Sequence, residues 1–416
     1  MEDDEFVSDD RVESGRRKIA WAGRHMPVLA AIEREFSESR PFQGISIAVS
    51  VHVEAKTACL ALALARGGAD VSLTGCNPLS TQDDVAAALA AGGMKVFCRH
   101  GADPDTYRIH LIQALQCVPH IVIDDGGDLA ELLHTTHSDL GLRIIGACEE
   151  TTTGVHRLRI LEREGRLRYP SMAVNDAECK HLFDNRFGTG QSVWTAVMAA
   201  TNLVVAGKTV VVAGFGMCGK GVALRAKGLG ANVIVTEIDP VKACEAHMEG
   251  YSVLPMAEAA KQGDLFITVT GCKDVITKEH YAVMKNDAVL CNAGHFDVEI
   301  NIPHLAEAAV ERRIMRENVE GFRMPDGRWI HLLAQGRLVN LAAGDGHPAE
   351  IMDMSFSLQA LAAEYMVKNG SGLERRVYEL PEEIDRRVAT LLLRSKSLSI
   401  DTLTPAQGTY LQTWEI

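Results

Sequence analysis

Short apolar runs rich in β-branched residues alternate with alanine-rich stretches of helical periodicity along most of the chain. Buried parallel strands are apolar throughout, so this alternation is typical of parallel sheets with helices on both faces. It predicts one group of strands at residues 45–51, 69–73, 95–98, 120–123, 143–146 and 171–174, and a second group at 209–213, 232–236, 264–268, 288–291 and around 328–332. We therefore expect an α/β protein with two doubly wound, Rossmann-like domains of parallel sheet.

A polar segment at residues 175–193 separates the two groups of strands and leads into an alanine-rich helix predicted at 194–205. A chain of 416 residues exceeds what one hydrophobic core usually supports, so we expect a hinge between two domains in this segment. The pattern then predicts helices at 349–368 and 381–395. This last part of the chain is expected to return to the first domain and to end in a helical segment.

Charge and composition narrow the choice of partners. The net charge is −13 and no segment concentrates lysine and arginine, so no nucleic-acid partner is expected. No window approaches the roughly 18 uninterrupted apolar residues of a spanning helix, so no membrane partner is expected either. Ten cysteines without a C-x-x-C pair indicate free thiols in a reducing cytoplasm, and the acidic residues 1–10 read as a frayed tail, not a secretory signal. His134 and His137 are close in sequence but have no third ligand nearby, so no metal site is predicted.

The segment KTVVVAGFGMCGKG, which begins at Lys208, reads as a strand that turns on glycines into a helix. Gly214, Gly216 and Gly219 match G-x-G-x-x-G, in which the glycines allow a tight turn, close approach of a pyrophosphate, and close packing of helix on strand. Glu237 ends the next predicted strand, where a carboxylate accepts hydrogen bonds from ribose hydroxyls and repels a 2′-phosphate. Together these features predict an NAD-binding unit.

Five polar clusters lie at the ends of predicted strands or in the hinge segment, where open α/β sheets bind their ligands. Each cluster has an ordinary alternative, because Asp-Asp-Gly-Gly is usually a turn, Glu-Thr-Thr-Thr a capped helix start, and a Lys-Asp pair at (i, i+4) a solvated helix pair. Their joint occurrence with an NAD site matches the needs of a hydroxyl-oxidising active site. The clusters are His52; Asp124, Asp125 and Asp128; Glu149, Glu150, Thr151, Thr152 and Thr153; Lys180, Asp184 and Asn185; and Asn292, His295 and Asp297.

From about residue 15 to residue 411 the chain resembles the S-adenosylhomocysteine hydrolase family. The resemblance rests on STQDD from Ser80, DDGGDL from Asp124, EETTTGVH from Glu149, FDN from Phe183, GHFDVE from Gly294, GRLVNL from Gly336 and GHP from Gly346. It implies a homotetramer that keeps NAD bound and splits a nucleoside thioether reversibly into homocysteine and the nucleoside. It also implies the chemistry: oxidation of the 3′-hydroxyl acidifies C4′–H, homocysteine leaves by elimination, water adds, and the ketone is reduced without net redox change.

The resemblance further implies roles for the polar clusters. Lys180 with Asn185 would take the 3′-hydroxyl proton, which requires a neutral lysine and hence a depressed pKa. Glu150 and Asp184 would hold the ribose hydroxyls. The other implied contacts are Asp125 with the C4′ proton, His52 and His295 with the leaving group and the attacking water, Thr151, Thr152, Thr153, Asn185, Glu237 and Asn340 with NAD, and His347 with the base.

With the strand pattern, the resemblance predicts a discontinuous substrate-binding domain at 1–180 and 348–388, an NAD-binding domain at 189–346, and a C-terminal oligomerisation segment at 389–416. Two departures concern the cofactor and the hinge. Thr189 replaces a cysteine of the family, and the last residue is Ile416, without the Lys- and Tyr-containing extension of long-tailed relatives. Weaker retention of NAD is expected from the second departure.

A third departure concerns the purine base. Glu54 and Lys56 replace the Thr and Glu that contact adenine in the family. An ionised Glu only accepts hydrogen bonds and a Lys only donates them, which suits the N1 donor and O6 acceptor of hypoxanthine better than the reversed edge of adenine. S-inosylhomocysteine is therefore the expected substrate, with S-adenosylhomocysteine as the alternative; the ordinary alternative for both side chains is exposure to solvent.

Two other functional classes share parts of this pattern. An ordinary NAD-dependent dehydrogenase would share the glycine fingerprint but would release NADH. A non-catalytic NAD-binding regulator would be expected to lose the reactive set, all of which is present here.

Overall fold

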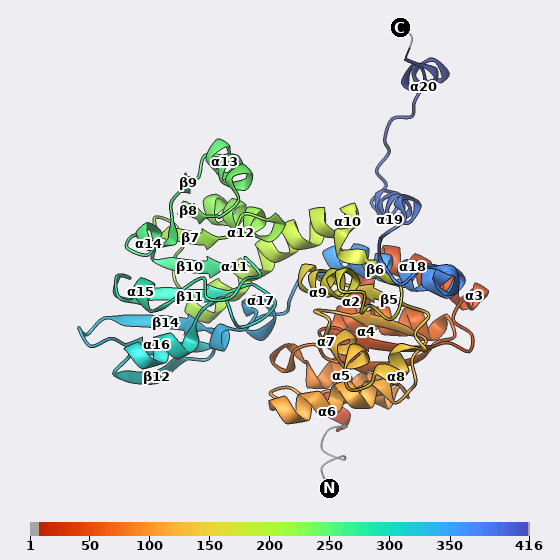
Figure 1. The fold of residues 1–416 in the computed structure, drawn as a ribbon, viewed down its shortest axis with the longest axis horizontal. Helices are drawn as coiled ribbons and strands as arrows, with labels where there is room; N and C mark the ends of the chain where they lie inside the picture. Colours follow the sequence, from red (N-terminus) through yellow and green to blue (C-terminus); the bar gives the residue numbers. More distant parts are fainter. Residues whose placement is uncertain (1–7, 415–416) are drawn as a thin grey trace.

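The computed structural model describes residues 8–414, which form two sheet units side by side (Figure 1). The first sheet has seven strands in the order β15-β6-β5-β4-β1-β2-β3. All of its pairs are parallel. Its strands are β1 Ser46–Ser50, β2 Asp70–Thr74, β3 Lys95–Phe97, β4 Ile121–Asp124, β5 Gly146–Glu149, β6 Ser171–Ala173 and β15 Val377–Glu379.

The second sheet has eight strands in the order β12-β13-β14-β11-β10-β7-β8-β9. Its strands are β7 Thr209–Ala213, β8 Asn232–Thr236, β9 Ser252–Val253, β10 Leu265–Thr268, β11 Ala288–Asn292, β12 Glu311–Arg316, β13 Val319–Arg323 and β14 Trp329–Leu333. Strand β13 pairs antiparallel with both β12 and β14. The second sheet is therefore mixed, whereas the sequence pattern predicts a purely parallel sheet. The charged sequence ERRIMR of β12 suits an exposed edge strand and carries no apolar run that would have predicted it.

Most predicted strands lie where expected, but the prediction for β5 is wrong. It was placed at residues 143–146, whereas the strand is Gly146–Glu149. The strand ends in a buried carboxylate, Glu149, which an apolarity pattern assigns to a loop. The prediction that the chain returns to the first sheet is confirmed by β15, which pairs with β6.

Helices cover both faces of each sheet. On β1, Ile47 and Val49 belong to one apolar cluster while Ala48 belongs to another on the opposite face. On β7, Val210 and Val211 divide in the same way. The longer helices are α2 Asp9–Arg24, α3 Pro27–Ser39, α4 Ala55–Arg66, α5 Asp83–Ala91, α6 Pro104–Leu115, α7 Asp128–His134, α9 Thr152–Arg163, α11 Thr189–Thr201, α12 Met217–Gly228, α13 Pro240–Met248, α16 Ile302–Ala308, α18 Ala349–Asn369, α19 Glu382–Ser395 and α20 Pro405–Gln412. The shorter ones are α8 Ser138–Gly141, α10 Glu178–Lys180, α14 Met256–Ala259, α15 Lys278–Tyr281 and α17 Val339–Ala342.

The predicted hinge segment is helical. Helix α10 continues into a π-helix, η3 (His181–Gly188), and then into α11, which begins five residues before the predicted 194. Figure 1 shows α10 and α11 running between the two sheet units. The chain crosses back through residues 343–348, between α17 and α18.

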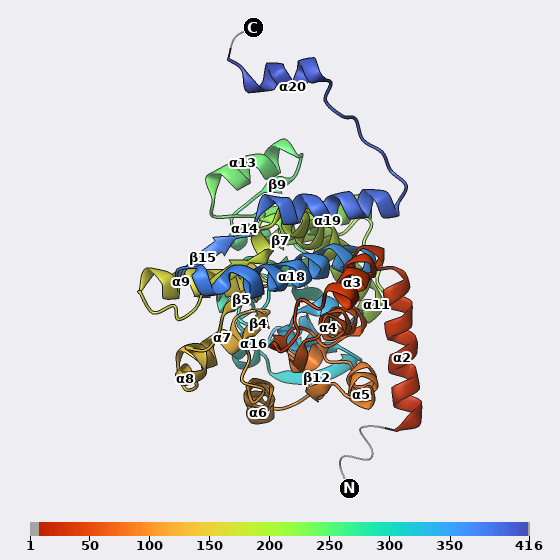
Figure 2. The same cartoon turned by 90° about the vertical axis from the view of Figure 1, so that its right-hand side faces the viewer.

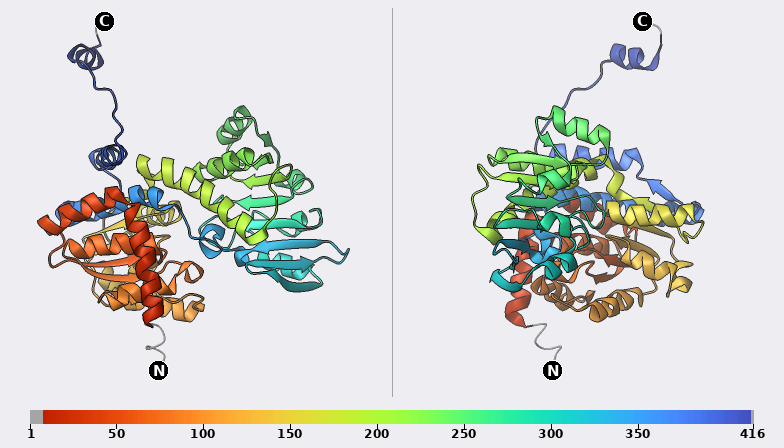
Figure 3. Two further views of the ribbon diagram at one scale, coloured as in Figure 1. Left: turned by 180° about the vertical axis from the view of Figure 1, so that it is seen from behind. Right: turned by 60° about the vertical axis from the view of Figure 1, so that its left-hand side comes forward.

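The described chain begins and ends with helices, α2 and α20. The N-terminal tail was expected at residues 1–10; residues 1–7 lie outside the described part, and Asp9 and Asp10 already belong to α2. The C-terminal helix α20 stands away from the body on an extended segment (Figures 2 and 3). Among the helices of the described chain, none is long and apolar enough to cross a membrane.

The strand order of the parallel part of each sheet reverses once, and the candidate site residues lie beside this reversal. In the first sheet β1 lies between β2 and β4, and in the second β7 lies between β8 and β10. Ligands of doubly wound sheets bind at the carboxyl ends of strands beside such a reversal. His52 follows β1 and Asp125 follows β4, whereas Gly214 follows β7 and Thr270 follows β10.

Candidate active site

Both reversals open into one large cavity of about 1270 Å³. Typical small-molecule pockets measure roughly 300–1,000 Å³, so this cavity has room for more than one drug-sized ligand. Of the residues with a predicted role, Lys56 and Gly219 do not line it, and neither do the cluster members Asp124, Asp128, Glu149, Asn292 and Asp297. The predicted residues that line it are His52, Glu54, Asp125, Glu150, Thr151, Thr152, Thr153, Lys180, Asp184, Asn185, Gly214, Gly216, Glu237, His295, Asn340 and His347.

The glycine loop after β7 fits a dinucleotide. Gly214 has a φ of 101°, and a Cβ on it would lie 2.9 Å from the Val269 carbonyl oxygen. A Cβ on Gly216 would meet no described atom within 4 Å, so this backbone is open to a ligand. Gly219 lies in α12, and a Cβ there would stand 2.0 Å from the Gly214 carbonyl oxygen. Its place outside the cavity therefore agrees with the predicted role in packing helix on strand.

Glu237 lies beside this loop at the end of β8. Its Oε2 accepts a hydrogen bond from the Phe215 N–H at 2.7 Å, and its Oε1 accepts one from the Ile238 N–H at 2.8 Å. The carboxylate is thus fixed next to the phosphate-binding turn and lines the cavity. These residues fit the adenosine half of NAD.

The π-helix gathers the polar residues around Lys180. A π-helix aligns residue i with residue i+5, and Lys180 Nζ donates to Asn185 Oδ1 at 2.9 Å. The same ammonium lies 3.0 Å from Asp184 Oδ1 and 3.4 Å from Glu150 Oε1. The ordinary alternative of a solvated Lys–Asp pair is wrong, because the side chains of Lys180 and Asp184 are 5% and 3% exposed.

The charges in this cluster perturb one another. Burial alone lowers the pKa of Lys180, but Asp184 and Glu150 raise it more, so the net pKa is above its ordinary value. The chain alone therefore does not depress this pKa, and the depression stays a prediction for the enzyme with the positively charged nicotinamide bound. Burial raises the pKa of Glu150 to about 8, against the lowering effect of Lys180. Burial also opposes ionisation of Asp184, yet Lys180 and His347 hold its pKa well below the ordinary range.

Helix α18 supplies two residues that the sequence reasoning missed. Ser355 Oγ donates to Asp184 Oδ2 at 2.7 Å, and Gln359 Nε2 donates to Glu150 Oε2 at 2.5 Å. Both are buried, as are Asp353 and Ser357 of the same helix. Ser355 and Gln359 lie four residues apart and hence on one face. Polar residues within the apolar stretch of this helix were the available signal.

His52, Asp125 and His295 form a second group. His52 Nε2 lies 3.5 Å from Asp125 Oδ2, and His295 Nδ1 lies 3.7 Å from Asp125 Oδ1. His52 Nδ1 is hydrogen-bonded to Ser80 Oγ at 2.7 Å, and Ser80 Oγ also donates to the Asn77 carbonyl at 2.8 Å. Burial lowers the pKa of His52 to about 4 despite the nearby Asp125, so the ring is neutral at physiological pH.

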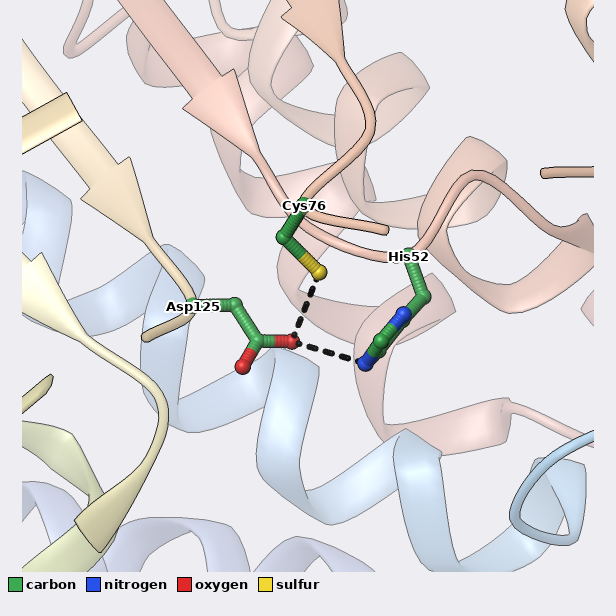
Figure 4. A group of neighbouring side chains, drawn as sticks. All are labelled: His52, Cys76 and Asp125. Atoms are coloured by element: carbon green, nitrogen blue, oxygen red, sulfur yellow. Dashed lines mark hydrogen bonds and ion pairs between the residues drawn. The ribbon is translucent and has the colours of Figure 1, made fainter. Parts of the chain in front are cut away.

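Cys76 joins this group from the loop after β2. Its Sγ donates to Asp125 Oδ2 at 3.5 Å, and Figure 4 shows the three side chains pointing at one another. Within the described residues, His52, Cys76 and Asp125 are a set close enough to hold a metal ion, with ligand atoms within 4.8 Å of one another. Burial and the charges of Asp125 and Asp128 raise the pKa of the Cys76 thiol well above its ordinary value. The thiol therefore stays protonated and acts as a donor to Asp125.

The two base-contacting candidates are buried, so exposure to solvent is excluded for both. Glu54 caps α4 by accepting the Lys56 N–H at 2.9 Å, and it lines the cavity. The Lys56 ammonium lies 2.8 Å from Glu54 Oε2 and donates to the Asp345 carbonyl at 2.6 Å. Lys56 is not among the residues that line the cavity, and its contact with the base stays a prediction.

The remaining predicted residues lie at the seam between the sheets. His347 Nδ1 lies 3.1 Å from Asp184 Oδ1, and its Nε2 lies 3.2 Å from Thr189 Oγ1. Asn340 Nδ2 donates to Ser192 Oγ at 3.0 Å, while its Oδ1 has no hydrogen-bond partner among the described atoms. Oδ1 of Asp125 and Oε1 of Glu150 are likewise buried without a hydrogen-bond partner there. Such atoms indicate a polar ligand in this cavity.

Two facing sheet reversals, a glycine loop with a carboxylate fixed beside it, and a buried acid–base cluster define an NAD-dependent enzyme. The comparisons with known proteins supply the family. Residues 6–141 match the model of S-adenosyl-L-homocysteine hydrolase, and residues 185–346 match the model of the NAD binding domain of that enzyme. The chain belongs to the S-adenosyl-L-homocysteine hydrolase family, and NAD is its cofactor, which confirms the resemblance and the enzyme class drawn from the sequence.

Curated relatives match nearly the whole chain. The S-inosyl-L-homocysteine hydrolase of Methanocaldococcus jannaschii is 56% identical, with 96% of each chain covered. The adenosylhomocysteinase of Pyrococcus abyssi is also 56% identical, over 96% of this chain and 95% of that protein. The S-inosyl-L-homocysteine hydrolase of Methanopyrus kandleri is 52% identical, over 96% of this chain and 95% of that protein. Relatives of equal similarity thus carry two substrate names.

Proposed function

We propose that this enzyme hydrolyses the thioether of a nucleosyl-homocysteine to homocysteine and a nucleoside. The observation that carries the proposal is that Lys180, Asp125 and His52 line the same cavity as the NAD-binding glycine loop. Bound NAD would oxidise the 3′-hydroxyl reversibly, so that the reaction has no net redox change. A stoichiometric release of free NADH during turnover would instead indicate an ordinary dehydrogenase.

Each polar group has a proposed task in this reaction. Lys180, oriented by Asn185, takes the proton of the 3′-hydroxyl, which requires that a bound, positively charged nicotinamide lower the raised pKa that this lysine has in the chain alone. Glu150 and Asp184 hold the ribose hydroxyls. Asp125 removes the C4′ proton, and its Oδ1 has no hydrogen-bond partner among the described atoms. His52 accepts a proton from the attacking water through Nε2, and His295 lies on the other side of Asp125.

We further propose that residues 1–180 and 348–388 bind the substrate, that residues 189–346 bind NAD, and that residues 389–416 mediate assembly into a homotetramer in the cytoplasm. The NAD contacts would come from Thr151, Thr152, Thr153, Asn185, Glu237, Asn340 and the three glycines. Exposed apolar side chains on the C-terminal segment support assembly, since Ile400, Leu403 and Trp414 are 73%, 64% and 90% exposed. Light scattering on the full chain and on a chain ending at Lys396 tests it; an unchanged mass after truncation would contradict it.

The preferred substrate in this proposal is S-inosyl-L-homocysteine, and the alternative is S-adenosyl-L-homocysteine. The position of Glu54 supports the preference, because an ionised carboxylate in the cavity accepts from the N1–H of hypoxanthine but repels the N1 lone pair of adenine. Mismatched buried polar groups give large discrimination between substrates.

The test is kcat/KM for the two thioethers with the wild-type enzyme and with the double variant Glu54→Thr, Lys56→Glu. We expect the wild type to favour the inosyl compound and the double variant to favour the adenosyl compound. A preference of about tenfold or more for the adenosyl compound in the wild type, equivalent to about 1.4 kcal/mol, overturns the assignment.

A further inference from the structure

Lys56 joins the base site to the segment by which the chain crosses between the two sheets. Its ammonium lies 2.8 Å from Glu54 Oε2 and donates to the backbone carbonyl of Asp345 at 2.6 Å. Its side chain is only 9% exposed, so both interactions are largely shielded from water. One buried charge thus connects a carboxylate that lines the cavity with residue 345 of the crossing at 343–348.

The crossing segment is shaped by glycines and held at further points. Gly346 has a φ of 70°, in the left-handed region that favours glycine, and its N–H donates to the Asn340 carbonyl at 2.8 Å. A Cβ on Gly346 would lie 2.6 Å from Leu341 Cδ2 and 3.7 Å from Lys56 Nζ, so the segment packs closely on the lysine. The next residue, His347, contacts Asp184 and Thr189.

These contacts attach the crossing segment to three different parts of the protein. Gly346 ties it to Asn340, on the side of the second sheet, and His347 ties it to the cluster around Lys180. Lys56 ties it to α4 of the first sheet and to Glu54. Any displacement of Glu54 by a ligand therefore acts on the crossing segment through Lys56.

We propose that Lys56 is a positioning residue that couples recognition of the purine base by Glu54 to the placement of the crossing segment and hence to closure of the two domains. A base that donates to Glu54 leaves the Glu54–Lys56–Asp345 chain intact. A base that presents an acceptor to Glu54 pushes the carboxylate away, and Lys56 follows it and releases Asp345. This inference rests on the proposed function and adds that base identity affects kcat as well as KM.

The test uses the NAD-loaded enzyme with three variants. Lys56→Met removes the charge and the donor, Lys56→Arg keeps both, and Lys95→Met removes a lysine of an exposed pair with Asp70 as the matched control. For each protein, kcat and KM are measured with the inosyl and adenosyl thioethers, and small-angle X-ray scattering gives the radius of gyration with and without inosine. Should Lys56→Met fail to fold, Lys56→Gln, which keeps N–H donors but removes the charge, takes its place.

We expect inosine to reduce the radius of gyration of the wild type. Lys56→Met should lower kcat for the inosyl thioether by roughly ten- to hundredfold and abolish this contraction. Lys56→Arg should largely restore both, and Lys95→Met should change neither. If Lys56→Met raises KM for the inosyl compound while kcat and the contraction stay at wild-type values, Lys56 acts on the base alone and the coupling is overturned. A wild-type preference for the adenosyl compound would instead refute the proposed substrate, independently of how the Lys56 variants behave.

Discussion

The carboxylate of Asp385 caps the helix that begins at Glu178, with Oδ2 accepting the Glu178 N–H at 2.7 Å. Its Oδ1 accepts the next N–H, that of Cys179, at 2.9 Å. The helix ends at Lys180, so a residue of α19 fixes the backbone that carries the proposed base. The C-terminal part of the chain is thereby tied to the chemistry.

Replacing Asp385 by Ala should lower both stability and turnover. Loss of a helix cap costs about 0.5–2 kcal/mol, which denaturant unfolding would measure. Because Lys180 loses its backbone anchor without losing any substrate contact, kcat should fall more than KM rises. Asp139→Ala, at an exposed position of α8, is the control. Wild-type kcat in Asp385→Ala would show that the cap does not position Lys180.

Replacing Lys180 by Arg should abolish turnover while leaving NAD bound. Arginine stays protonated at all accessible pH values, so it cannot take the 3′-hydroxyl proton, although it can still pair with Asp184. Loss of a general base typically lowers kcat by about 10²- to 10⁴-fold. NADH fluorescence after mixing with the nucleoside measures the oxidation step alone. Rapid NADH formation in Lys180→Arg would assign the base elsewhere; Lys285→Arg, in an exposed pair with Asp264, is the control.

The hydrophobic pattern along the chain predicts structure that depends on local periodicity. It does not predict contacts between segments that are distant in sequence. The strand–glycine–helix unit from Thr209 to Gly228 follows from sequence, because its turn and packing depend on glycines within it. Ser355 contacts Asp184 and Asp385 contacts Glu178, although each pair is far apart in sequence. No sequence feature near Asp184 or Glu178 predicts these contacts. The same holds for Lys56, whose direction is set by Asp345, 289 residues away.

Glu237→Ser should weaken NAD binding and reduce the discrimination against NADP. The carboxylate beside the glycine loop would repel a 2′-phosphate, and serine removes this charge while keeping a polar group. Loss of a charge-assisted hydrogen bond of about 1.5–3 kcal/mol corresponds to at least a tenfold weaker NAD affinity. Calorimetry on the apoenzyme with both dinucleotides checks the result, with Glu258→Ser on the exposed α14 as control. Unchanged affinities would place the ribose away from Glu237.

Chelation should leave the activity intact, even though His52, Cys76 and Asp125 have metal-binding geometry. The high pKa of the buried Cys76 thiol opposes the deprotonation that metal ligation requires. Dialysis against a chelator, followed by elemental analysis and an activity assay, tests this expectation. Parallel loss of one equivalent of metal and of activity would make the group a functional metal centre.

Asp353 should make the folded state less stable as the pH rises from about 4 to about 6. Its carboxylate accepts the N–H groups of Val28 and Leu29 at 3.0 and 2.8 Å, but burial raises its pKa from 3.8 to about 6. In this interval the folded chain keeps a proton that the unfolded chain has lost, so the contribution of Asp353 is full below the unfolded pKa and is lost as the pH rises through 6.

A shift of about two pKa units corresponds to about 3 kcal/mol. The difference in free energy of unfolding between wild type and Asp353→Asn, measured by denaturant unfolding at several pH values, should therefore fall by an amount of this order across the interval. Taking the difference removes the slopes of the other carboxylates, which both proteins share. Asp401→Asn, an exposed carboxylate, should show a flat difference. A difference for Asp353→Asn that rises or stays level with pH would show that the two backbone donors outweigh burial at this site.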